Sequence, residues 1–297
     1  MFADLVVPLD GSELAHKALP YAAALARVTH GRLVLVRAIE TWAATVPQAI
    51  QQELERKPGA EADLDLEAAA LRGQGLDVTT AAYVGEAAAA IDAAAASHHA
   101  DTIVMSTHGR SGIARLAYGS VAERVLGRAH LPVLLVPPHA QQSWPAAGSR
   151  IVVPLDGSPR AESALAPARE LAQLLGAALT VLQVIEPPNL AYAAGAPMGA
   201  IPELAPEKWA NDVRPYGEQV AERLRKAGLD ASSEVLVGYV APTIVDVAQR
   251  ERASAIVMAT HGRTGLARAF MGSVANGVIS RATTPVLAIR PAMNRGD

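Results

Sequence analysis

The sequence contains no cysteine among its 297 residues. This absence excludes disulfide bonds, thiolate metal ligands and a cysteine nucleophile, and it suits a reducing cytoplasm. Long apolar segments are also missing. The alanine-rich run over 87–96 is interrupted by Asp92, and no stretch reaches the roughly 18–20 apolar residues that span a bilayer. The first residues carry neither a basic flank nor an apolar core, so we expect no signal peptide and a cytoplasmic location.

An excess of charge of one sign is lacking too. The formal net charge is −3 and charged residues make up only 19% of the chain, so no electrostatic argument favours nucleic acid or an anionic membrane as partner. Aromatic residues account for only 4%, so the core must be built from Ala, Val, Leu and Ile. With 51% hydrophobic residues, the chain can fill the cores of two domains of about 150 residues each.

Several catalytic motifs are absent. There is no Gly-x-x-x-x-Gly-Lys-Ser/Thr loop, no Gly-x-Ser-x-Gly elbow and no Gly-x-Gly-x-x-Gly after the first predicted strand. These absences exclude a P-loop NTPase, a serine hydrolase of the elbow type and a dinucleotide-binding Rossmann domain. No His-x-Gly-His is present for nucleotidyl transfer either. The sequence therefore offers no catalytic residue and no metal-ligand pattern.

What the sequence does contain is a duplication. Residues 4–12 reappear as 150–158, and a glycine-rich stretch over 106–120 recurs over 259–273. The spacing between copies rises from 146 to 153 residues, so the second half gains seven residues, which we place in the Pro/Gly-rich stretch over 186–207. Repeats of this length indicate tandem domains rather than a solenoid. We predict domains over 1–138 and 149–297, joined by a linker over 139–148.

Each half alternates apolar strand-like runs with helix-like segments. The first half predicts strands over 5–9, 32–39, 76–84, 102–105 and 132–136, and helices over 14–28, 50–72, 86–98 and 121–129. Pro20 should kink or divide the first helix, and Pro58 is a candidate break in the second. Five continuous apolar strands alternating with helices predict an α/β fold with a parallel sheet covered on both faces.

In such sheets a ligand binds beyond the carboxyl ends of the strands. The glycine-rich stretch follows the fourth strand, and its Gly109, Gly119 and Ser120 would bring free backbone N–H groups to an anion at a helix start. The alternative is that Ser120 only caps its helix, with Glu123 completing a capping box.

Asp10 ends the first strand, at the same predicted edge, and Asp156 repeats it. Either carboxylate could accept a hydrogen bond from a ribose hydroxyl or an adenine amino group, or help to hold Mg²⁺. The alternative is an aspartate that serves only its own turn. His108 and His261 lack a neighbouring nucleophile, so we expect structural roles for them.

These residues resemble the universal stress protein family in its tandem two-domain form. The family signature is Gly-x-x-Gly, nine residues, then Gly-Ser/Thr. It is matched by Gly109 with Gly119-Ser120 and by Gly262 with Gly272-Ser273. The first glycine of the signature is replaced by Ser106 in one half and Ala259 in the other.

The resemblance implies two Rossmann-like domains of the adenine nucleotide alpha hydrolase type, which form an intramolecular pseudo-dimer through strands over 132–136 and 285–290. It also implies that each domain binds ATP, with or without Mg²⁺. In that arrangement the aspartate contacts the adenosine end, the backbone at the end of the second strand frames the adenine, and the phosphates lie along the glycine loop. The positions so implied are Asp10, Ala38, Gly109, Gly119, Ser120 and Val121 in the first half, and Asp156, Val184, Gly262, Gly272, Ser273 and Val274 in the second.

The function implied is a cytoplasmic stress-response protein that binds an adenine nucleotide and acts as a nucleotide-responsive regulator. Two alternatives stay open: a slow Mg-dependent ATPase, and a nucleotide-free dimerisation scaffold, because Ser106 and Ala259 replace the signature glycine. A homo-oligomer through the last strands or the helices is a further expectation, with no nucleic-acid or membrane partner.

Overall fold

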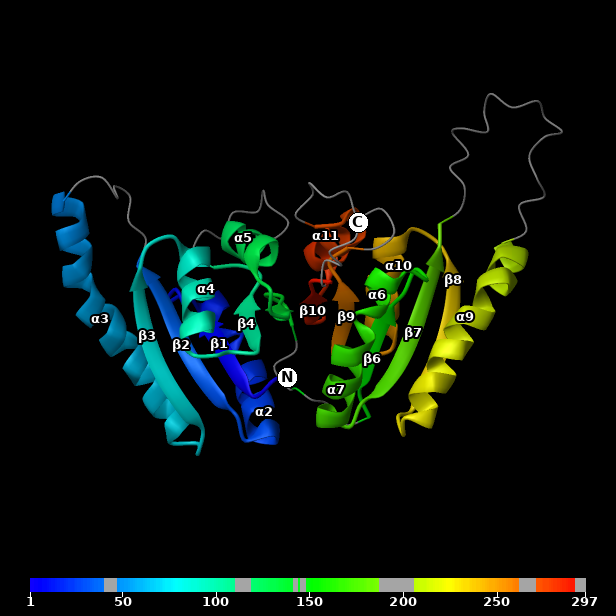
Figure 1. Cartoon of the computed structure of the whole chain (residues 1–297), viewed down its shortest axis with the longest axis horizontal. Coiled ribbons are helices and arrows are strands. Elements are labelled where there is room, and N and C mark those ends of the chain that lie inside the picture. Colours follow the sequence, from blue (N-terminus) through cyan, green and yellow to red (C-terminus); the bar gives the residue numbers. More distant parts are fainter. Residues whose placement is uncertain are drawn as a thin grey trace, which may run out of the picture.

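A computed structural model describes residues 1–39, 47–109, 119–140, 144, 148–186, 206–261 and 271–291. These residues form one ten-stranded sheet in the order β3-β2-β1-β4-β5-β10-β9-β6-β7-β8. Every neighbouring pair is parallel except β5 and β10, which are antiparallel. The predicted α/β fold of two five-stranded parallel units is thus confirmed, and Figure 1 shows the units side by side.

The elements of the first half are β1 (Asp4–Pro8), α1 (Glu13–His16), α2 (Leu19–Thr29), β2 (Arg32–Ile39), α3 (Pro47–Arg72), β3 (Asp77–Val84), α4 (Ala87–Ser97), β4 (Thr102–Ser106), α5 (Ser120–Arg128) and β5 (Val133–Val136). The chain runs outward from β1 to β3 and then returns to place β4 against the other side of β1. The strand order therefore reverses between β1 and β4, which is where open α/β sheets leave a crevice for a ligand.

The elements of the second half are β6 (Arg150–Pro154), α6 (Pro159–Glu162), α7 (Leu165–Leu175), β7 (Ala178–Ile185), α9 (Pro206–Lys226), β8 (Ala231–Val237), α10 (Val240–Arg250), β9 (Ala255–Ala259), α11 (Ser273–Arg281) and β10 (Val286–Ile289). They repeat the topology of the first half. The seven extra residues fall within 186–207, most of which lies outside the described residues.

Pro20 and Pro58, the two prolines expected to interrupt helices of the first half, behave differently: Pro20 marks a helix boundary as predicted, and Pro58 does not. The predicted helix over 14–28 is divided into α1 and α2, and Pro20 stands in the first turn of α2, where its missing N–H costs nothing. The candidate break near Pro58 is wrong, because α3 continues through it. Ser12 is the N-cap of α1 as expected, since its side chain accepts a hydrogen bond from the Ala15 N–H at 3.1 Å.

The sheet is covered by one layer of helices on each face. Successive strand residues point to opposite faces. Leu33 and Leu35 of β2 therefore belong to the apolar cluster on the face covered by α2, α3, α7 and α9, whereas Val34 and Val36 belong to the cluster on the face covered by α4, α5, α10 and α11. Alanine occupies many helix positions that face the sheet, which lets the helix backbones approach it closely. Two continuous apolar layers result, and each includes residues of both halves.

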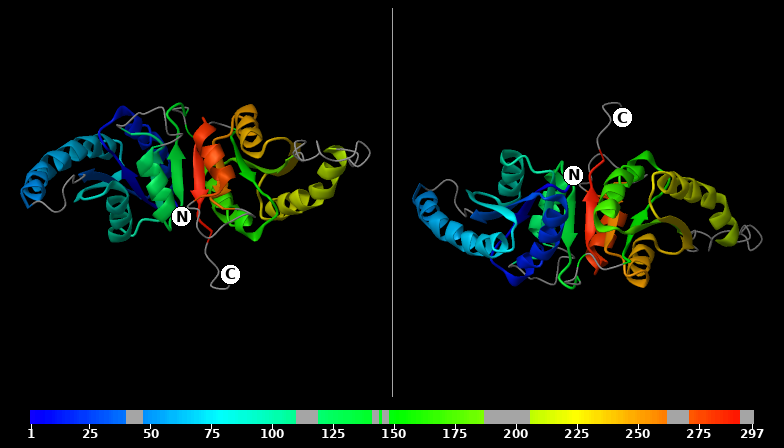
Figure 2. Two further views of the ribbon diagram at one scale, coloured as in Figure 1. Left: turned by 90° about the horizontal axis from the view of Figure 1, so that it is seen from above. Right: turned by 90° about the horizontal axis from the view of Figure 1, so that it is seen from below.

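The two halves join through the antiparallel pairing of β5 and β10 at the centre of the sheet. Val286 faces Leu135, Leu287 faces Leu134 and Ala288 faces Val133, and Figure 2 shows the two strands side by side. The predicted pairing of the last strands within one chain is confirmed. Each of these strands has neighbours on both sides. A homo-oligomer cannot extend the sheet through these two strands, because no free edge remains on them; association through the helices stays a prediction.

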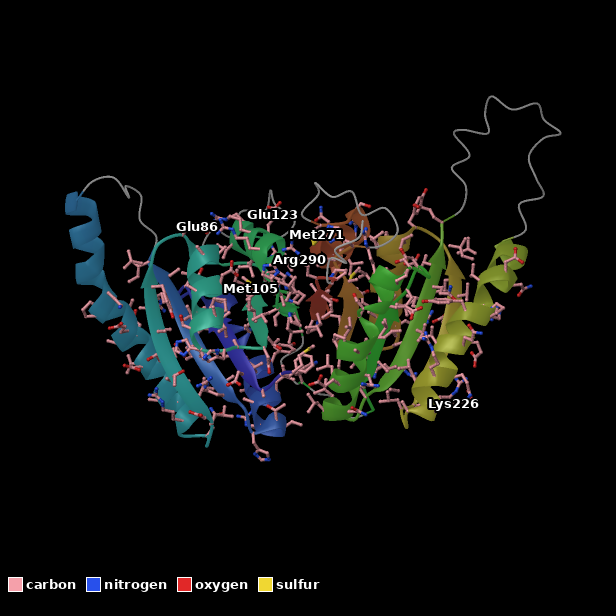
Figure 3. All side chains as sticks on the ribbon, in the orientation of Figure 1. Glu86, Met105, Glu123, Lys226, Met271 and Arg290 are labelled. Atoms are coloured by element: carbon pink, nitrogen blue, oxygen red, sulfur yellow. The ribbon has the colours of Figure 1, made fainter. Side chains whose placement is uncertain are left out.

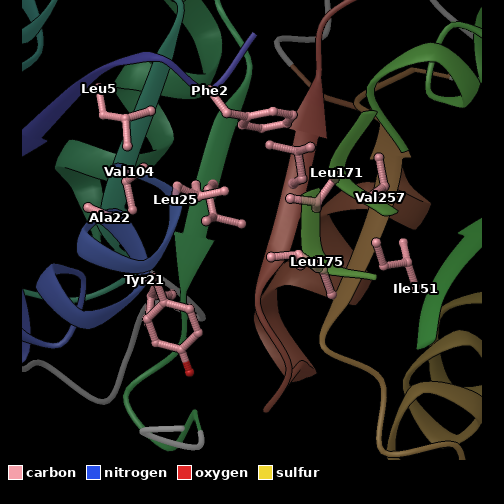
Figure 4. Close-up of a cluster of buried hydrophobic side chains, with 14 of the residues drawn as sticks. Phe2, Leu5, Tyr21, Ala22, Leu25, Val104, Ile151, Leu171, Leu175 and Val257 are labelled. Carbon is pink, nitrogen blue, oxygen red and sulfur yellow. The ribbon is translucent and has the colours of Figure 1, made fainter. Parts of the chain in front are cut away.

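Contacts on one face extend the junction beyond the sheet. Phe2 is fully buried and lies among residues of both halves, including Leu25 of α2 and Leu171 of α7 (Figure 4). Trp144, from the linker, stacks at a tilt on Tyr21 of the first half at 5.3 Å between ring centroids. Its indole N–H donates to the Ser254 carbonyl of the second half at 2.8 Å. The linker thus contacts both halves.

No helix among the described residues is both long and apolar enough to cross a membrane.

The junction generates a stability prediction. Leu287→Ala should lower the free energy of unfolding by about 2–5 kcal/mol, because Leu287 is fully buried against Leu134 across the central strand pair. Urea unfolding followed by circular dichroism measures this. The matched control is Leu66→Ala on α3, where the side chain is 74% exposed and a change within about 0.5 kcal/mol is expected. Equal decreases in the free energy of unfolding for the two variants would contradict the assignment of the junction to the hydrophobic core.

Candidate functional site

A cavity of about 770 Å³ opens at the carboxyl ends of β1, β2 and β4 in the first half. Its volume lies within the range of roughly 300–1,000 Å³ that small-molecule sites occupy. The structure brings six of the predicted site residues together in its lining: Asp10, Ala38, Gly109, Gly119, Ser120 and Val121. They come from three separate segments of the chain, and the strand reversal between β1 and β4 is what unites them.

Asp10 and Gly109 meet at the centre of the cavity. The Asp10 carboxylate accepts a hydrogen bond from the Ser12 N–H at 2.9 Å, which shapes the turn after β1. A Cβ placed on Gly109 would clash with Oδ2 of the same carboxylate. Glycine at 109 therefore lets the backbone after β4 approach the Asp10 carboxylate without displacing it. Asp10 thus shapes its own turn and also lines the cavity.

The start of α5 closes the other side of the cavity. Gly119 is the N-cap, in extended conformation with φ −66° and ψ 149°, and no side chain caps the helix. The Gly119 N–H donates to the Thr107 carbonyl at 2.7 Å, which ties the helix start to the end of β4. The capping-box alternative is wrong, because Ser120 is the first helical residue rather than the cap. The N–H groups of the first turn, at Ser120, Val121 and Ala122, have no intrahelical acceptor, and all three residues line the cavity.

The floor of the cavity beside the glycine loop is polar and buried. Ser106 and Thr107 are 6% and 3% exposed. The Ser106 hydroxyl accepts a hydrogen bond from the His108 N–H at 3.3 Å, and Oγ1 of Thr107 lies 3.0 Å from Nδ1 of His108. Burial, together with the nearby His139, lowers the pKa of His108. His108 thus bonds to both of its preceding residues, through its backbone N–H and its ring.

Arg37 and Asp63 form an ion pair that lines the cavity beside β2 and α3. The sequence analysis missed this pair. Arg37 is 8% exposed, and its Nε donates to the Leu9 carbonyl at 3.2 Å while Nη1 donates to Oδ2 of Asp63 at 2.9 Å. Next to Asp63 on α3, the small residues Gly59 and Ala60 also line the space. One signal was available: Arg37 interrupts the apolar run of β2 at the strand's carboxyl end.

A second missed group stands at the mouth of the cavity. Arg124 lines it one turn after Ser120, and its Nη1 lies 3.0 Å from Oε1 of Glu86. Glu86 also pairs with Arg128 at 2.8 Å and accepts hydrogen bonds from the Ala88 and Ala89 N–H groups at the start of α4. Figure 3 shows Glu86 and Glu123 at the upper ends of α4 and α5. Partial burial opposes ionisation of Glu86, but these N–H groups and guanidinium groups outweigh it and lower its pKa.

The second half repeats the backbone frame. Asp156 accepts a hydrogen bond from the Ser158 N–H at 2.9 Å, and the Gly272 N–H donates to the Thr260 carbonyl at 2.8 Å. Gly272 caps α11 without a side-chain bond, so Ser273 and Val274 open that helix as Ser120 and Val121 open α5. Val184 lies near the carboxyl end of β7. The predicted Gly262 lies outside the described residues.

Metal chemistry has no evident site here. Among the residues that the structure describes, no group of three or more histidine or acidic side chains comes together to hold an ion.

Comparison with known proteins identifies what this arrangement is similar to. The sequence model of the Universal stress protein family matches residues 1–137 and again residues 149–290. Universal stress protein Rv1996 of Mycobacterium tuberculosis is 26% identical over 314 residues, which cover 96% of this chain and 94% of that protein. Universal stress protein MJ0531 of Methanocaldococcus jannaschii is 32% identical over 141 residues, 48% of this chain and 81% of its own length.

Solved structures show the same fold. A universal stress protein from Archaeoglobus fulgidus matches with a TM-score of 0.71 at 20% identity and covers 98% of this chain and 97% of its own. A protein described as a putative universal stress protein from Pseudomonas aeruginosa matches with a TM-score of 0.65 at 20% identity, covering 97% of this chain and 93% of its own.

The ion pairs at the cavity mouth generate a pH prediction. A glutamate whose pKa is lowered by folding contributes stability that is present at neutral pH and is lost as the pH falls through the folded-state pKa. Glu86→Gln should therefore cost about 1 kcal/mol at pH 7, the usual worth of a helix cap, and the gap to wild type should close in acid. Thermal unfolding from pH 7 down to pH 3 measures it.

Glu123→Gln is the matched control, because Glu123 is an exposed acid in the first turn of α5. We expect it to change stability little at either pH. A deficit for Glu86→Gln that stays constant into acid would show that shape rather than charge matters at this position.

Proposed function

The chain belongs to the universal stress protein family, and on that premise we propose that it is a cytoplasmic stress-response regulator that binds an adenine nucleotide in the cavity of its first half. The observation that carries the proposal is the convergence of the six predicted residues on one cavity of about 770 Å³ at the strand reversal. The size of the space suits a nucleotide, and its two ends differ in the way that a nucleotide's ends differ.

At one end the cavity offers groups suited to a nucleoside. The Asp10 carboxylate would accept hydrogen bonds from ribose hydroxyls or the adenine amino group. The backbone at Ala38, at the end of β2, would frame the adenine. The small side chains of Gly59 and Ala60 leave room for a ring system.

At the other end the cavity offers groups suited to phosphate. Gly109 and Gly119 allow the backbone to approach an anion. The first N–H groups of α5 lie at the positive end of the helix dipole, which favours an anion there. Ser120 adds a hydroxyl donor. The charges of phosphate would thus be met by backbone groups that are already in place, which lowers the cost of ordering them on binding.

A regulatory role requires that a partner distinguish the loaded from the empty protein. A bound nucleotide would add phosphate charge beside the starts of α4 and α5, where Glu86 and Arg124 form the surface. A partner that contacts this surface would bind the two states with different affinity, and by linkage it would change nucleotide affinity by the same factor. No residue of the described cavity is assigned a catalytic role.

The direct experiment is to denature protein purified without added ligand and to identify any released nucleotide, with its molar ratio, by mass spectrometry. Equilibrium dialysis with MgATP follows if nothing is released. Failure to bind any adenine nucleotide in both assays would overturn the proposal and leave the scaffold alternative.

Asp10→Ala should weaken nucleotide binding about 10-fold to 100-fold, the effect of losing a hydrogen bond to a charged group. Isothermal titration with MgATP measures the change. Asp10→Asn separates the two roles of the residue, because the amide oxygen can still accept from the Ser12 N–H and keep the turn. Unchanged affinity in Asp10→Ala, with the fold intact by circular dichroism, would remove Asp10 from the site.

A further inference from the structure

The two halves keep the same frame but differ in the side chains that line it. The β pairings and the helix ends fix the correspondence: Arg37 faces Ala82 as Gln183 faces Val235. Arg72 and Arg225, in the last turns of α3 and α9, each donate to a carbonyl of the following strand. The residues that form the backbone frame of the first site recur at equivalent positions, for example Asp10 as Asp156 and Gly119 as Gly272. The cavity-lining residues whose charge or bulk changes most are Arg37 to Gln183, Gly59 to Asp212, Ala60 to Val213, Asp63 to Tyr216 and Arg124 to Gly277. Smaller changes are Val36 to Leu182, Ala38 to Val184, Ala87 to Val240 and Ser106 to Ala259.

At the phosphate end, the second half excludes an arginine at the position equivalent to 124. A Cβ on Gly277 would lie 2.8 Å from the Cβ of Ala241, because α11 packs on α10 where the stem of Arg124 stands in the first half. The counterpart of Glu86 is Tyr239, which is 71% exposed and makes no cap for α10. Arg281, the counterpart of Arg128, donates to the Gly277 carbonyl of its own helix at 3.0 Å.

At the positions equivalent to the proposed nucleoside end, the second half carries bulkier side chains. Tyr216 replaces Asp63, and its hydroxyl donates to Oε1 of Glu162 on α6 at 2.9 Å, so the ring is tied across from α9 to the helix that follows the Asp156 turn. Burial, the bond to Glu162 and the charges of Glu162 and Asp156 raise the pKa of Tyr216.

The counterpart of Arg37 is Gln183, an uncharged residue that packs against α9. Gln183 lies against Gly217 of α9, where any Cβ would clash with its Oε1. That buried oxygen has no hydrogen-bond partner in the described structure. The second half therefore supplies neither the Arg–Asp pair at the nucleoside end nor the guanidinium at the mouth.

We infer that the chain binds one nucleotide, in the first half, with the Arg124 guanidinium on its phosphate chain, and that the second half keeps the frame as a structural copy. This inference rests on the proposed function. Arg124 suits the role because it is 45% exposed and lines the cavity, and a guanidinium pairs well with phosphate oxygens. Glu86 keeps Arg128 and two helix N–H groups as partners when Arg124 turns to the ligand.

The first test is stoichiometry and location. Titration of the full chain with MgATP should give one site, and photolabelling with 8-azido-ATP followed by peptide mapping should mark residues 1–138 alone. No binding at all would overturn the proposed function itself. Two sites of similar affinity, or label in both halves, would overturn this inference and leave the proposed function standing.

The second test is a matched pair of arginine variants. Arg124→Gln should weaken MgATP binding about 10-fold to 100-fold and change adenosine binding less than about twofold, because adenosine carries no phosphate. Arg128→Gln removes the other ion pair of Glu86 without touching the cavity, and should leave both affinities within about twofold. Equal effects of the two variants, or an equal loss for adenosine, would show that Arg124 only supports the helix start.

The third test rebuilds the lining of the second half in the first. A Cβ on Gly59 meets nothing within 4 Å, so Gly59→Asp combined with Ala60→Val should fold normally. Binding of adenosine and of MgATP should both fall by at least about tenfold, because the added groups occupy the cavity. Unchanged adenosine affinity in a folded variant would remove α3 from the site.

Discussion

The close approach of two backbones at the strand reversal organises this protein. β1 and β4 are far apart in the chain but adjacent in the sheet, so the turn after one meets the loop after the other. Gly109 abuts the Asp10 carboxylate, and the Gly119 N–H reaches back to the Thr107 carbonyl. Neither contact would survive an ordinary side chain unchanged, since a Cβ on Gly119 would lie 3.1 Å from the Thr107 oxygen. The cavity is the space that these contacts leave above the sheet.

The duplication covers one open edge of each five-stranded unit, as well as repeating the site. A five-stranded unit of this topology would expose β5 along its open edge, a row of unpaired backbone groups. Pairing β5 with β10 removes that edge from both halves at once and makes two continuous apolar layers. The remaining edges are β3 and β8, each far from the centre. Each half thus covers the open sheet edge of the other.

The fold and the frame of the site could be predicted from the sequence because their signals are local. Apolar runs mark the strands, and Asp10, Gly109 and Gly119 stand at fixed places beside them. Arg37 and Arg124 were missed because their ion-pair partners are distant in the sequence. Asp63 lies 26 residues from Arg37 and Glu86 lies 38 residues from Arg124, and only packing brings them near. Ser120 was offered as a cap because the pattern around a helix start is the same whether the cap stands one residue earlier or later.

The same contacts explain why the glycine signature alone is weak evidence for a ligand. Gly119 and Gly272 make the same hydrogen bond, to Thr107 and Thr260, and each would bring a Cβ within 3.1 Å of that carbonyl. Both glycines therefore favour the close approach of strand and helix whether or not an anion binds there. Information about the ligand lies instead in the residues that the frame does not require, which are those that differ between the halves. A duplicated fold can keep its stability through the shared frame while only one copy retains the side chains that face the cavity.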